Sequence, residues 1–268
     1  MTAAAERPRV GSSLPFGDYA RYYDLLYRDK DYAAEADYVA RVIRSAAPDA
    51  RRVLELGSGT GRHGRLLAAR GFVVHGVERS PDMVALAQAA AAPPPAADAG
   101  FSCEVGDACA VRLDRTFDAV IALFHVVSYQ TSDAALEAMF ATAARHLMPG
   151  GVFLFDVWHG PAVLAQQPEQ RVKRAADGDL EVIRTARPQL DAERSTVKVT
   201  YDMECRNRRS GETVRFCEDH LVRYLFPAEI ERLAAQAGMR MIKSEEFVTA
   251  RPPSDATWGV AYLLKRLN

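Results

Sequence analysis

The sequence lacks most of the features that mark metal-binding, secreted or membrane proteins. Its 268 residues include only four cysteines, which form no Cys-x-x-Cys pair and have no histidine cluster beside them. We therefore expect no metal site, and reduced thiols in a cytoplasmic protein. The longest apolar run, "AVIALFHVV" at 119–127, is far too short to span a bilayer, so no membrane partner is expected. The first ten residues contain no apolar stretch of the kind that directs secretion.

An excess of charge of one sign is also absent. The chain carries 34 Lys and Arg against 35 Asp and Glu, a net charge of −1, so we expect no nucleic-acid partner. Two short basic clusters, at 171–174 and 206–209, are expected on a solvated face or in a hairpin turn. Hydrophobic residues make up 49% of the chain, which is typical of a globular protein.

Predicted strands and helices alternate along the first 160 residues. The expected strands cover 51–57, 72–78, 101–108, 117–127 and 150–158. The expected helices cover 33–47, 61–71, 80–92 and 133–150. Ser80 as N-cap and Pro81 in the first turn mark the start of one of them. This alternation predicts an α/β fold with a doubly wound, mostly parallel sheet and helices on both of its faces.

The pattern then changes to long alternating segments, which predict an antiparallel β insertion after the fifth strand. These segments cover 179–189, 195–205 and 212–226, and a helix at 227–239 and a strand at 257–266 follow them. We expect one domain over 1–268. Its parts are a Tyr-rich lid at 1–32 with a disordered start, a cofactor-binding core at 33–160, the antiparallel substrate-side layer at 161–226, and a closing helix and strand at 227–268.

A glycine-rich loop follows the first predicted strand, in "VLELGSGTGRHG" at 53–64. The spacing Gly59-x-Gly61-x-x-Gly64 matches the fingerprint of dinucleotide-binding folds, in which backbone N–H groups hold a pyrophosphate. Here, however, the strand ends with Glu55, whose carboxylate would repel a pyrophosphate. A carboxylate in a partly dry cleft attracts a cation instead. The loop therefore predicts a positively charged ligand rather than a nicotinamide dinucleotide.

Two further acidic residues end the next two predicted strands. Glu78 lies at about the spacing expected for an acceptor of ribose hydroxyl groups. Asp107, in "EVGDA", can accept a hydrogen bond from an exocyclic amine. Together with Glu55 these carboxylates predict a nucleoside that carries a cation and no phosphate, a description that S-adenosylmethionine fits.

Five segments in order resemble the motifs of class I S-adenosylmethionine-dependent methyltransferases: "VLELGSGTGRHG", "VERSPDMV", "GDA", "FDAVIALF" and "LMPGGVFLFD". The resemblance covers about residues 20–160 and implies a Rossmann-like methyltransferase fold that binds S-adenosylmethionine. It implies that the methionine end contacts Glu55, Gly57, Gly59 and Gly61. It implies further that Glu78 holds the ribose, and that Asp107 and Ala108 hold the adenine. Other implied cofactor contacts are Tyr23, Ser58, Arg79, Met83, Cys109 and Phe124, of which Met83 could equally belong to the core.

The rest of the chain is similar in layout to N-methyltransferases that dimethylate nucleotide-linked amino sugars in antibiotic pathways. The shared features are Tyr-Asp-x-x-Tyr (Tyr23, Asp24, Tyr27), "KDYAAEA" at 30–36 and the alternating layer. The resemblance implies methylation of the amine of such a sugar, or of a similar natural-product precursor, and it leaves room for a homodimer. O- or C-methylation of an aromatic or indole-like metabolite stays open, because the tyrosines and Trp158 would suit it.

His125 and Tyr129 are the candidate catalytic residues near the acceptor. The amino-sugar group tends to carry a His at the position of Tyr129, whereas this chain has His125 four residues earlier, at the expected tip of the fourth strand. An unperturbed His could take a proton at neutral pH, but it could also be held by a backbone carbonyl. Tyr129 could orient the acceptor.

Candidate substrate contacts follow the fifth strand, the lid and the last alternating segment. Asp156 could hold an ammonium group, and Trp158 could form a wall or a cation–π contact. Either His220 and Tyr224 cap the substrate while Arg223 points outward, or Arg223 meets a substrate phosphate. Tyr27, one turn after Tyr23 on the same expected helix face, completes this set.

Overall fold

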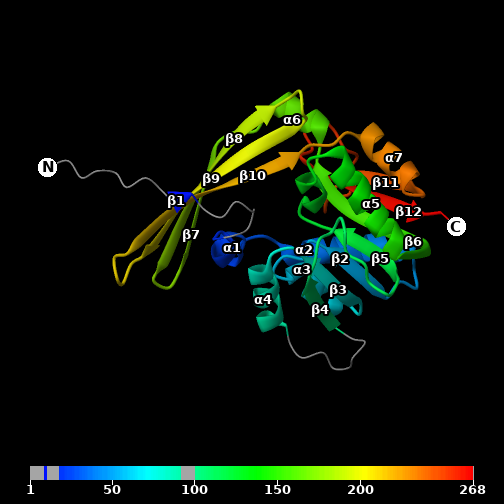
Figure 1. Ribbon diagram of the computed structural model, residues 1–268, viewed down its shortest axis with the longest axis horizontal. Helices are drawn as coiled ribbons and strands as arrows, with labels where there is room; N and C mark the ends of the chain where they lie inside the picture. Colours follow the sequence, from blue (N-terminus) through cyan, green and yellow to red (C-terminus); the bar gives the residue numbers. More distant parts are fainter. Residues whose placement is uncertain (1–8, 11–17, 92–99, 268) are drawn as a thin grey trace. The chain divides into compact units, whose positions relative to one another are not determined.

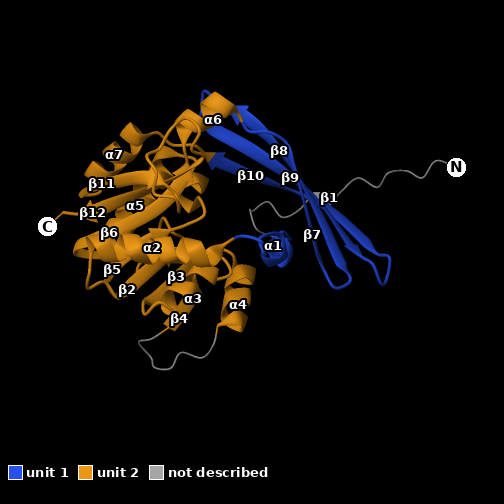
Figure 2. Ribbon diagram, turned by 180° about the vertical axis from the view of Figure 1, so that it is seen from behind, with its two compact units in different colours: residues 1–30, 168–222 blue, residues 31–167, 223–268 orange. Residues whose placement is uncertain are grey.

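A computed structural model describes residues 9–10, 18–91 and 100–267 (Figure 1). The start of the expected lid and nearly all of the Pro- and Ala-rich loop at 91–100 lie outside the described residues. The chain divides into two compact units (Figure 2). The smaller unit holds residues 1–30 and 168–222, and these ranges nearly match those expected for the lid and the antiparallel layer. The larger unit holds residues 31–167 and 223–268.

The larger unit is built on a seven-stranded sheet in the order β11-β12-β6-β5-β2-β3-β4. Its strands are β2 (Arg52–Leu56), β3 (Val73–Glu78), β4 (Gly100–Val105), β5 (Phe117–Ala122), β6 (Leu147–Trp158), β11 (Met239–Glu246) and β12 (Gly259–Arg266). The first five pair in parallel, and β11 and β12 are antiparallel. The chain crosses from one side of β2 to the other between β4 and β5, and ligands bind at the carboxyl ends of strands beside such a switch.

Helices cover both faces of this sheet (Figure 1). They are α2 (Tyr32–Ala46), α3 (Arg62–Ala68), α4 (Pro81–Ala90), α5 (Asp133–His146), α6 (Gly160–Gln166) and α7 (Pro227–Gln236). One buried cluster joins the sheet to α5 and α7, through Phe140 and Leu233 among others. A second cluster joins it to α2, α3 and α4, through Ile43 and Leu67. The predicted doubly wound α/β fold is confirmed.

Local sequence signals explain where several helices begin. The Ser80 hydroxyl accepts a hydrogen bond from the Met83 amide, and Pro81 opens α4, as predicted. Ser132 caps α5 through the Ala135 amide, and the Asp31 carboxylate caps α2. Each cap satisfies an amide that the helix itself leaves without a partner.

The smaller unit is a five-stranded sheet in the order β1-β10-β9-β8-β7, with one helix packed on it. Its elements are β1 (Arg9–Val10), α1 (Ala20–Leu26), β7 (Arg171–Asp177), β8 (Leu180–Asp191), β9 (Thr196–Asn207) and β10 (Thr213–Arg223). β8 pairs antiparallel with both β7 and β9, which confirms the predicted antiparallel insertion. Three strands were not predicted: β7, which carries the basic cluster at 171–174, β11, and β1, which lies within the start that was expected to be disordered.

The predicted fourth strand is too long. β5 ends at Ala122, and Phe124 and His125 then adopt left-handed backbone angles, with φ of 63° and 64°. A 3₁₀ turn, η1 (Val126–Tyr129), follows and buries Val127 and Ser128. A run of apolar residues does not distinguish a buried turn from a buried strand. His125 therefore lies in the turn after the strand rather than at its tip.

We predict that Gly57→Ala lowers the free energy of unfolding by about 2–4 kcal/mol, because left-handed strain and over-packing add. Gly57 has φ of 74°, and a Cβ atom there would lie 2.6 Å from the Val126 methyl groups. Gly238→Ala is the matched control. Gly238 has φ of 69° and open space around it, so strain alone should cost about 1–2 kcal/mol. Equal losses in urea unfolding would show that Gly57 is not tightly packed.

Candidate active site

The glycine loop between β2 and α3 combines tight packing with one open position. Gly57, Gly59 and Gly61 all have positive φ. A Cβ atom at Gly61 would lie 2.5 Å from the Phe101 ring, so this glycine is required for packing. At Gly59 the nearest atom is the Met83 sulfur, at 3.8 Å. The backbone at Gly59 is thus the one of the three that a ligand could approach closely.

Glu78, at the end of β3, fixes this open position. Its carboxylate accepts hydrogen bonds from the amides of Gly59, at 3.0 Å, and Ser80, at 2.8 Å. Burial raises the pKa of Glu78, and these backbone hydrogen bonds oppose the rise. The sequence placed Glu78 at the ligand site, and the structure brings it to the glycine loop.

Glu55 is a buried acid beneath the same loop. The residue is 1% exposed, and within the described part of the chain its Oε2 atom has no hydrogen-bond partner. Burial, and then the charge of Glu78, raise the pKa of Glu55 to about 8, whereas Arg65 acts in the opposite direction. The hydroxyl oxygen of Ser58 is likewise buried without a partner among the described residues. Unsatisfied oxygen acceptors and two neighbouring acids fit a cationic ligand with amine and hydroxyl donors, and they do not fit a pyrophosphate.

A histidine links Glu55 to the helix α2. His63 Nε2 lies 2.6 Å from Glu35 Oε2, and His63 Nδ1 lies 3.9 Å from Glu55 Oε1. The Tyr32 ring packs on His63, with ring centroids 5.0 Å apart. The sequence analysis missed Glu35 and Arg65 as neighbours of the site. The motif "KDYAAEA", which contains Tyr32 and Glu35, was the signal that could have revealed the first of them.

The expected adenine residues form a turn after β4. Asp107 Oδ1 accepts a hydrogen bond from the Cys109 amide at 2.8 Å, and Ala108 and Cys109 pack against the core. Burial raises the pKa of the Cys109 thiol to about 11. Arg79 is exposed, and Met83 is 2% exposed beside Gly59. Met83 therefore contributes to the core at the edge of the loop, and the adenine assignments stay predictions.

On the acceptor side, the structure brings together His125 and Asp156. His125 Nδ1 lies 2.7 Å from Asp156 Oδ2, and Asp156, near the end of β6, is 1% exposed. The Trp158 ring meets His125 edge-on, and Phe124 and Tyr129 are half-buried on either side of the turn. The Asp156 carboxylate is thus buried against His125, which argues against its expected role of holding an ammonium group.

Arg223 and Tyr224 are engaged within the larger unit. The Arg223 guanidinium pairs with Asp133 of α5, at 2.7 Å, and with Glu229 of α7. Two carboxylates therefore already balance its charge, which argues against the expected phosphate contact. Tyr224 lies just after β10, is 1% exposed and packs on Phe226, so the structure also offers no support for its role as a cap.

In the smaller unit, a buried cluster ties α1 to the sheet. Arg184 Nη1 donates to the hydroxyl oxygens of Tyr19 and Tyr27, at 2.8 and 2.9 Å. Tyr19 stacks on Tyr201, and Tyr23 packs against Tyr27, with ring centroids 4.8 Å apart. The tyrosines thus share one side of the helix, as their spacing predicts, and the sequence analysis missed Arg184.

His220 belongs to the same cluster. It is 1% exposed, and its Nε2 atom lies 2.9 Å from Glu218 Oε1. The Tyr201 ring packs against it, with centroids 4.7 Å apart. This burial within the smaller unit argues against the expected role of His220 as a substrate cap, because its partners hold it inside the packing of α1 on the sheet.

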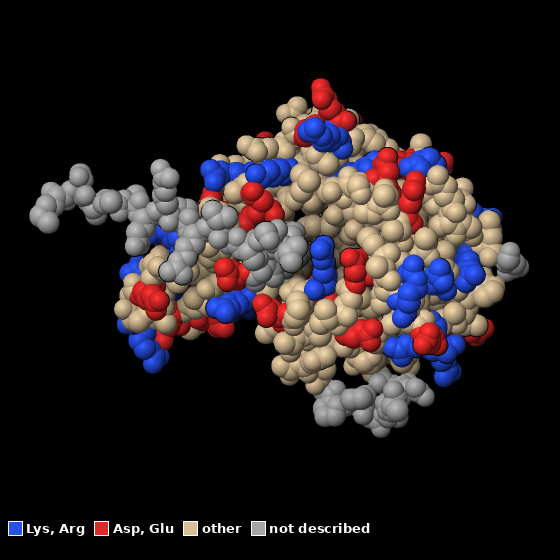
Figure 3. Space-filling view, in the orientation of Figure 1, with Lys and Arg blue, Asp and Glu red and all other residues tan. Residues whose placement is uncertain are grey.

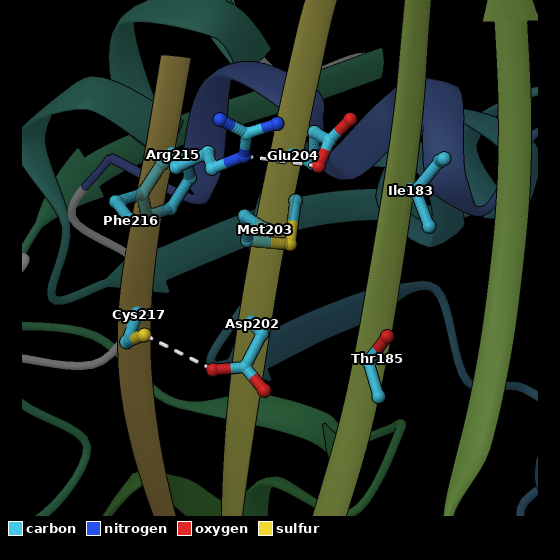
Figure 4. A pocket seen from close by; sticks show the side chains of 8 residues that line it. All are labelled: Ile183, Thr185, Asp202, Met203, Glu204, Arg215, Phe216 and Cys217. Atoms are coloured by element: carbon cyan, nitrogen blue, oxygen red, sulfur yellow. Dashed lines mark hydrogen bonds and ion pairs between the residues drawn. The ribbon is translucent and has the colours of Figure 1, made fainter. Parts of the chain in front are cut away.

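A hollow of about 250 Å³ lies on β8, β9 and β10 of the smaller unit (Figure 4). Its polar side chains pair with one another. The Cys217 thiol donates to Asp202 Oδ1 at 3.0 Å, and the Arg215 guanidinium donates to Glu204 at 3.0 Å. Asp202 also pairs with Arg187, at 2.7 Å, so each charged side chain of the lining already has a partner of opposite charge, and nothing in the hollow marks it as the reaction site.

The surface charge is mixed. On the face shown in Figure 3, acidic and basic side chains of the described residues are interspersed rather than gathered into a broad patch of one sign. Within the described ranges, no group of three His, Cys, Asp or Glu side chains could hold a metal ion. No helix in the same ranges is long and apolar enough to cross a membrane.

Comparison with known proteins assigns the family. Residues 53–151 match the family described as "Methyltransferase domain". The chain is 33% identical over 227 residues to a dTDP-3-amino-3,4,6-trideoxy-alpha-D-glucopyranose N,N-dimethyltransferase of Streptomyces venezuelae, and the match covers 84% of this chain and 91% of that protein. It is also 33% identical over 147 residues to a dTDP-3-amino-3,6-dideoxy-alpha-D-glucopyranose N,N-dimethyltransferase of Streptomyces fradiae, covering 54% of this chain and 55% of that protein.

Solved structures agree over almost the whole chain. DesVI of Streptomyces venezuelae matches with a TM-score of 0.76 and 27% identity, covering 94% of this chain and 99% of that one. The sugar N-methyltransferase KedS8 of a Streptoalloteichus species matches with a TM-score of 0.80 and 25% identity, covering 100% of both chains. Three observations agree: the acids at the strand ends beside a glycine loop, the fold, and the similarity to these relatives. The chain belongs to the S-adenosylmethionine-dependent methyltransferases.

Proposed function

We propose that this methyltransferase methylates the amine of a nucleotide-linked amino sugar. The observation that carries the proposal is the similarity, over 84% of the chain, to an enzyme whose name describes N,N-dimethylation of a dTDP-linked amino sugar. The histidine near the end of β5, backed by a buried carboxylate, supports it, because an amine that arrives as an ammonium must lose a proton before its lone pair can react. All four cysteines are free, which supports the cytoplasm as the compartment.

The residues divide the work between cofactor and acceptor. When bound, S-adenosylmethionine supplies a methyl group that is already activated by the sulfonium. The chain's own task is to deprotonate the acceptor ammonium and to hold its lone pair in line with that methyl group, and such positioning can contribute several kcal/mol. His125 is the proposed proton acceptor, and Tyr129, at the end of the same turn, is proposed to orient the acceptor.

Cofactor binding is proposed at the carboxyl edge of β2, β3 and β4. The open backbone at Gly59 and the buried Ser58 hydroxyl support placing the methionine end along the glycine loop. Glu78, next to Gly59, is proposed to accept the ribose hydroxyls. The turn at Asp107 is proposed to hold the adenine.

We predict that the affinity for S-adenosylmethionine rises with pH because of Glu55. Below its pKa of about 8 the Glu55 carboxyl is protonated. A bound cation favours the ionised carboxylate, so binding releases this proton and becomes stronger as the pH rises. Affinity should therefore rise by up to about tenfold per pH unit between about pH 5.5 and pH 7, where an α-amino group stays protonated. Glu55→Gln, which has the same shape and no titration, should flatten this dependence in calorimetric titrations. The same slope in both proteins would exclude Glu55 as its source.

We also predict that Glu78→Ala weakens S-adenosylmethionine binding by about 1–3 kcal/mol. The substitution removes the carboxylate that is proposed to accept the ribose hydroxyls, and it removes the acceptor that holds the Gly59 amide. Glu104→Ala is the control, since Glu104 lies opposite Val77 on the neighbouring strand β4 but is exposed. Isothermal titration should show near wild-type affinity for the control. Unchanged affinity in Glu78→Ala would place the ribose elsewhere.

The substrate class is tested with a panel of acceptors. Purified enzyme should form S-adenosylhomocysteine with dTDP-linked amino sugars, and mass spectrometry should show added methyl groups on nitrogen. The corresponding dTDP-sugars with a hydroxyl in place of the amine should give no product. Turnover with phenols or indoles, and none with amino sugars, would overturn the proposal in favour of O- or C-methylation.

A further inference from the structure

His125 sits in a backbone conformation that needs support. Phe124 and His125 have φ of 63° and 64°, and non-glycine residues in this region are strained unless their surroundings hold them. The support comes from β6, because Asp156 Oδ2 accepts a hydrogen bond from the His125 backbone amide at 3.2 Å. The same oxygen therefore meets both the backbone and the side chain of one residue.

The imidazole is confined around this contact. Nδ1 lies 2.7 Å from Asp156 Oδ2, within ion-pair distance, but among the described residues it has no hydrogen-bond partner. Such contacts often tighten only when substrate is bound. The Trp158 ring lies edge-on with its centroid 6.3 Å away, and a Cβ atom at Gly259 would be in ordinary contact with His125 Cε1, at 3.6 Å. One edge of the ring thus faces Asp156.

The other edge is accessible. Nδ1 is buried, whereas the His125 side chain as a whole is 26% exposed. Among the described residues, Nε2 has no hydrogen-bond partner. If Nδ1 keeps its proton for the carboxylate, the lone pair of the imidazole is on Nε2, the nitrogen that can meet a substrate.

We propose that Asp156 is the positioning residue of this enzyme: it holds His125 in the Nδ1–H tautomer so that Nε2 accepts the proton of the acceptor ammonium. This inference deepens the proposed function and rests on it for the identity of the acceptor. In the step, the N–H bond of the ammonium breaks and an N–H bond forms at Nε2. The charge moves to the imidazolium, which the Asp156 carboxylate stabilises.

A second buried acid nearby provides a matched control. Glu245, on β11, is 5% exposed and accepts a hydrogen bond from the Tyr38 hydroxyl at 2.9 Å. It also pairs with Lys243 at 2.7 Å. Glu245→Gln thus removes a buried carboxylate from the same unit without touching His125.

The experiment compares Asp156→Asn, Glu245→Gln and His125→Gln with the wild type. For Asp156→Asn we expect kcat to fall by about 10- to 100-fold, the usual cost of losing an outer partner of a functional histidine. KM for the amine and affinity for S-adenosylmethionine should change by less than about twofold, and Glu245→Gln should retain its kcat. In the His125→Gln background, Asp156→Asn should have no further effect on kcat.

Tautomer measurement tests the pair without relying on turnover. Long-range ¹H–¹⁵N spectra of ¹⁵N-histidine-labelled protein, with the His125 signal assigned from His125→Gln, should show Nδ1–H in the wild type and a mixture in Asp156→Asn. Nε2–H in the wild type would overturn the proposal even if Asp156→Asn fails to fold, and so would an unchanged kcat in a folded Asp156→Asn. If no amino sugar is methylated, the proposed function fails, whereas the tautomer still reports on the pair.

Discussion

The site depends on two carboxyl groups that the sheet forces together in a nearly dry place. Glu55 and Glu78 lie at the carboxyl ends of the neighbouring strands β2 and β3. Burial raises the pKa of both, and the charge of Glu78 raises the pKa of Glu55 further. Ionising both acids of such a pair is unfavourable. A cation beside the glycine loop would lower this cost, which supports the proposed binding of the sulfonium nucleoside there. The backbone amides that hold Glu78 keep one of the two acids in place.

On the acceptor side, a buried carboxylate again lies beside a second titratable group, here Asp156 beside His125. Asp156 is buried at the end of β6, and it faces a histidine that the turn after β5 presents in a left-handed conformation. β5 and β6 are adjacent in the parallel part of the sheet. The carboxyl ends of β2, β3, β5 and β6 thus place the two acids and the proposed proton acceptor along one edge, which suits the proposed transfer from a sulfonium to an amine.

Local chemistry allowed most of the larger unit to be predicted from the sequence. Ser80 and Pro81 mark the start of α4 through contacts within one turn, and the period of the apolar residues distinguishes strands from helices. The acidic strand ends could be assigned because each lies at the end of a predicted strand. The turn at Phe124 and His125 could not, since the apolar residues that bury it also suit a strand.

Contacts between distant residues account for the rest. Arg184 meets Tyr19 across 165 positions of sequence, and Tyr38 meets Glu245 across 207, so no local pattern indicates either pair. The same reason explains why the burial of His220 against Glu218 and Tyr201, and the neutralisation of Arg223 by two helices, were missed. The partner of a polar side chain decides whether it is available to a ligand, and only the fold determines that partner.

A crystal structure of the protein with bound S-adenosylmethionine tests the central claim most directly. The account predicts the ribose hydroxyls within hydrogen-bonding distance of Glu78, and the methionine end along Gly57–Gly61 above Glu55. An adenosyl group bound away from both carboxyls would contradict it.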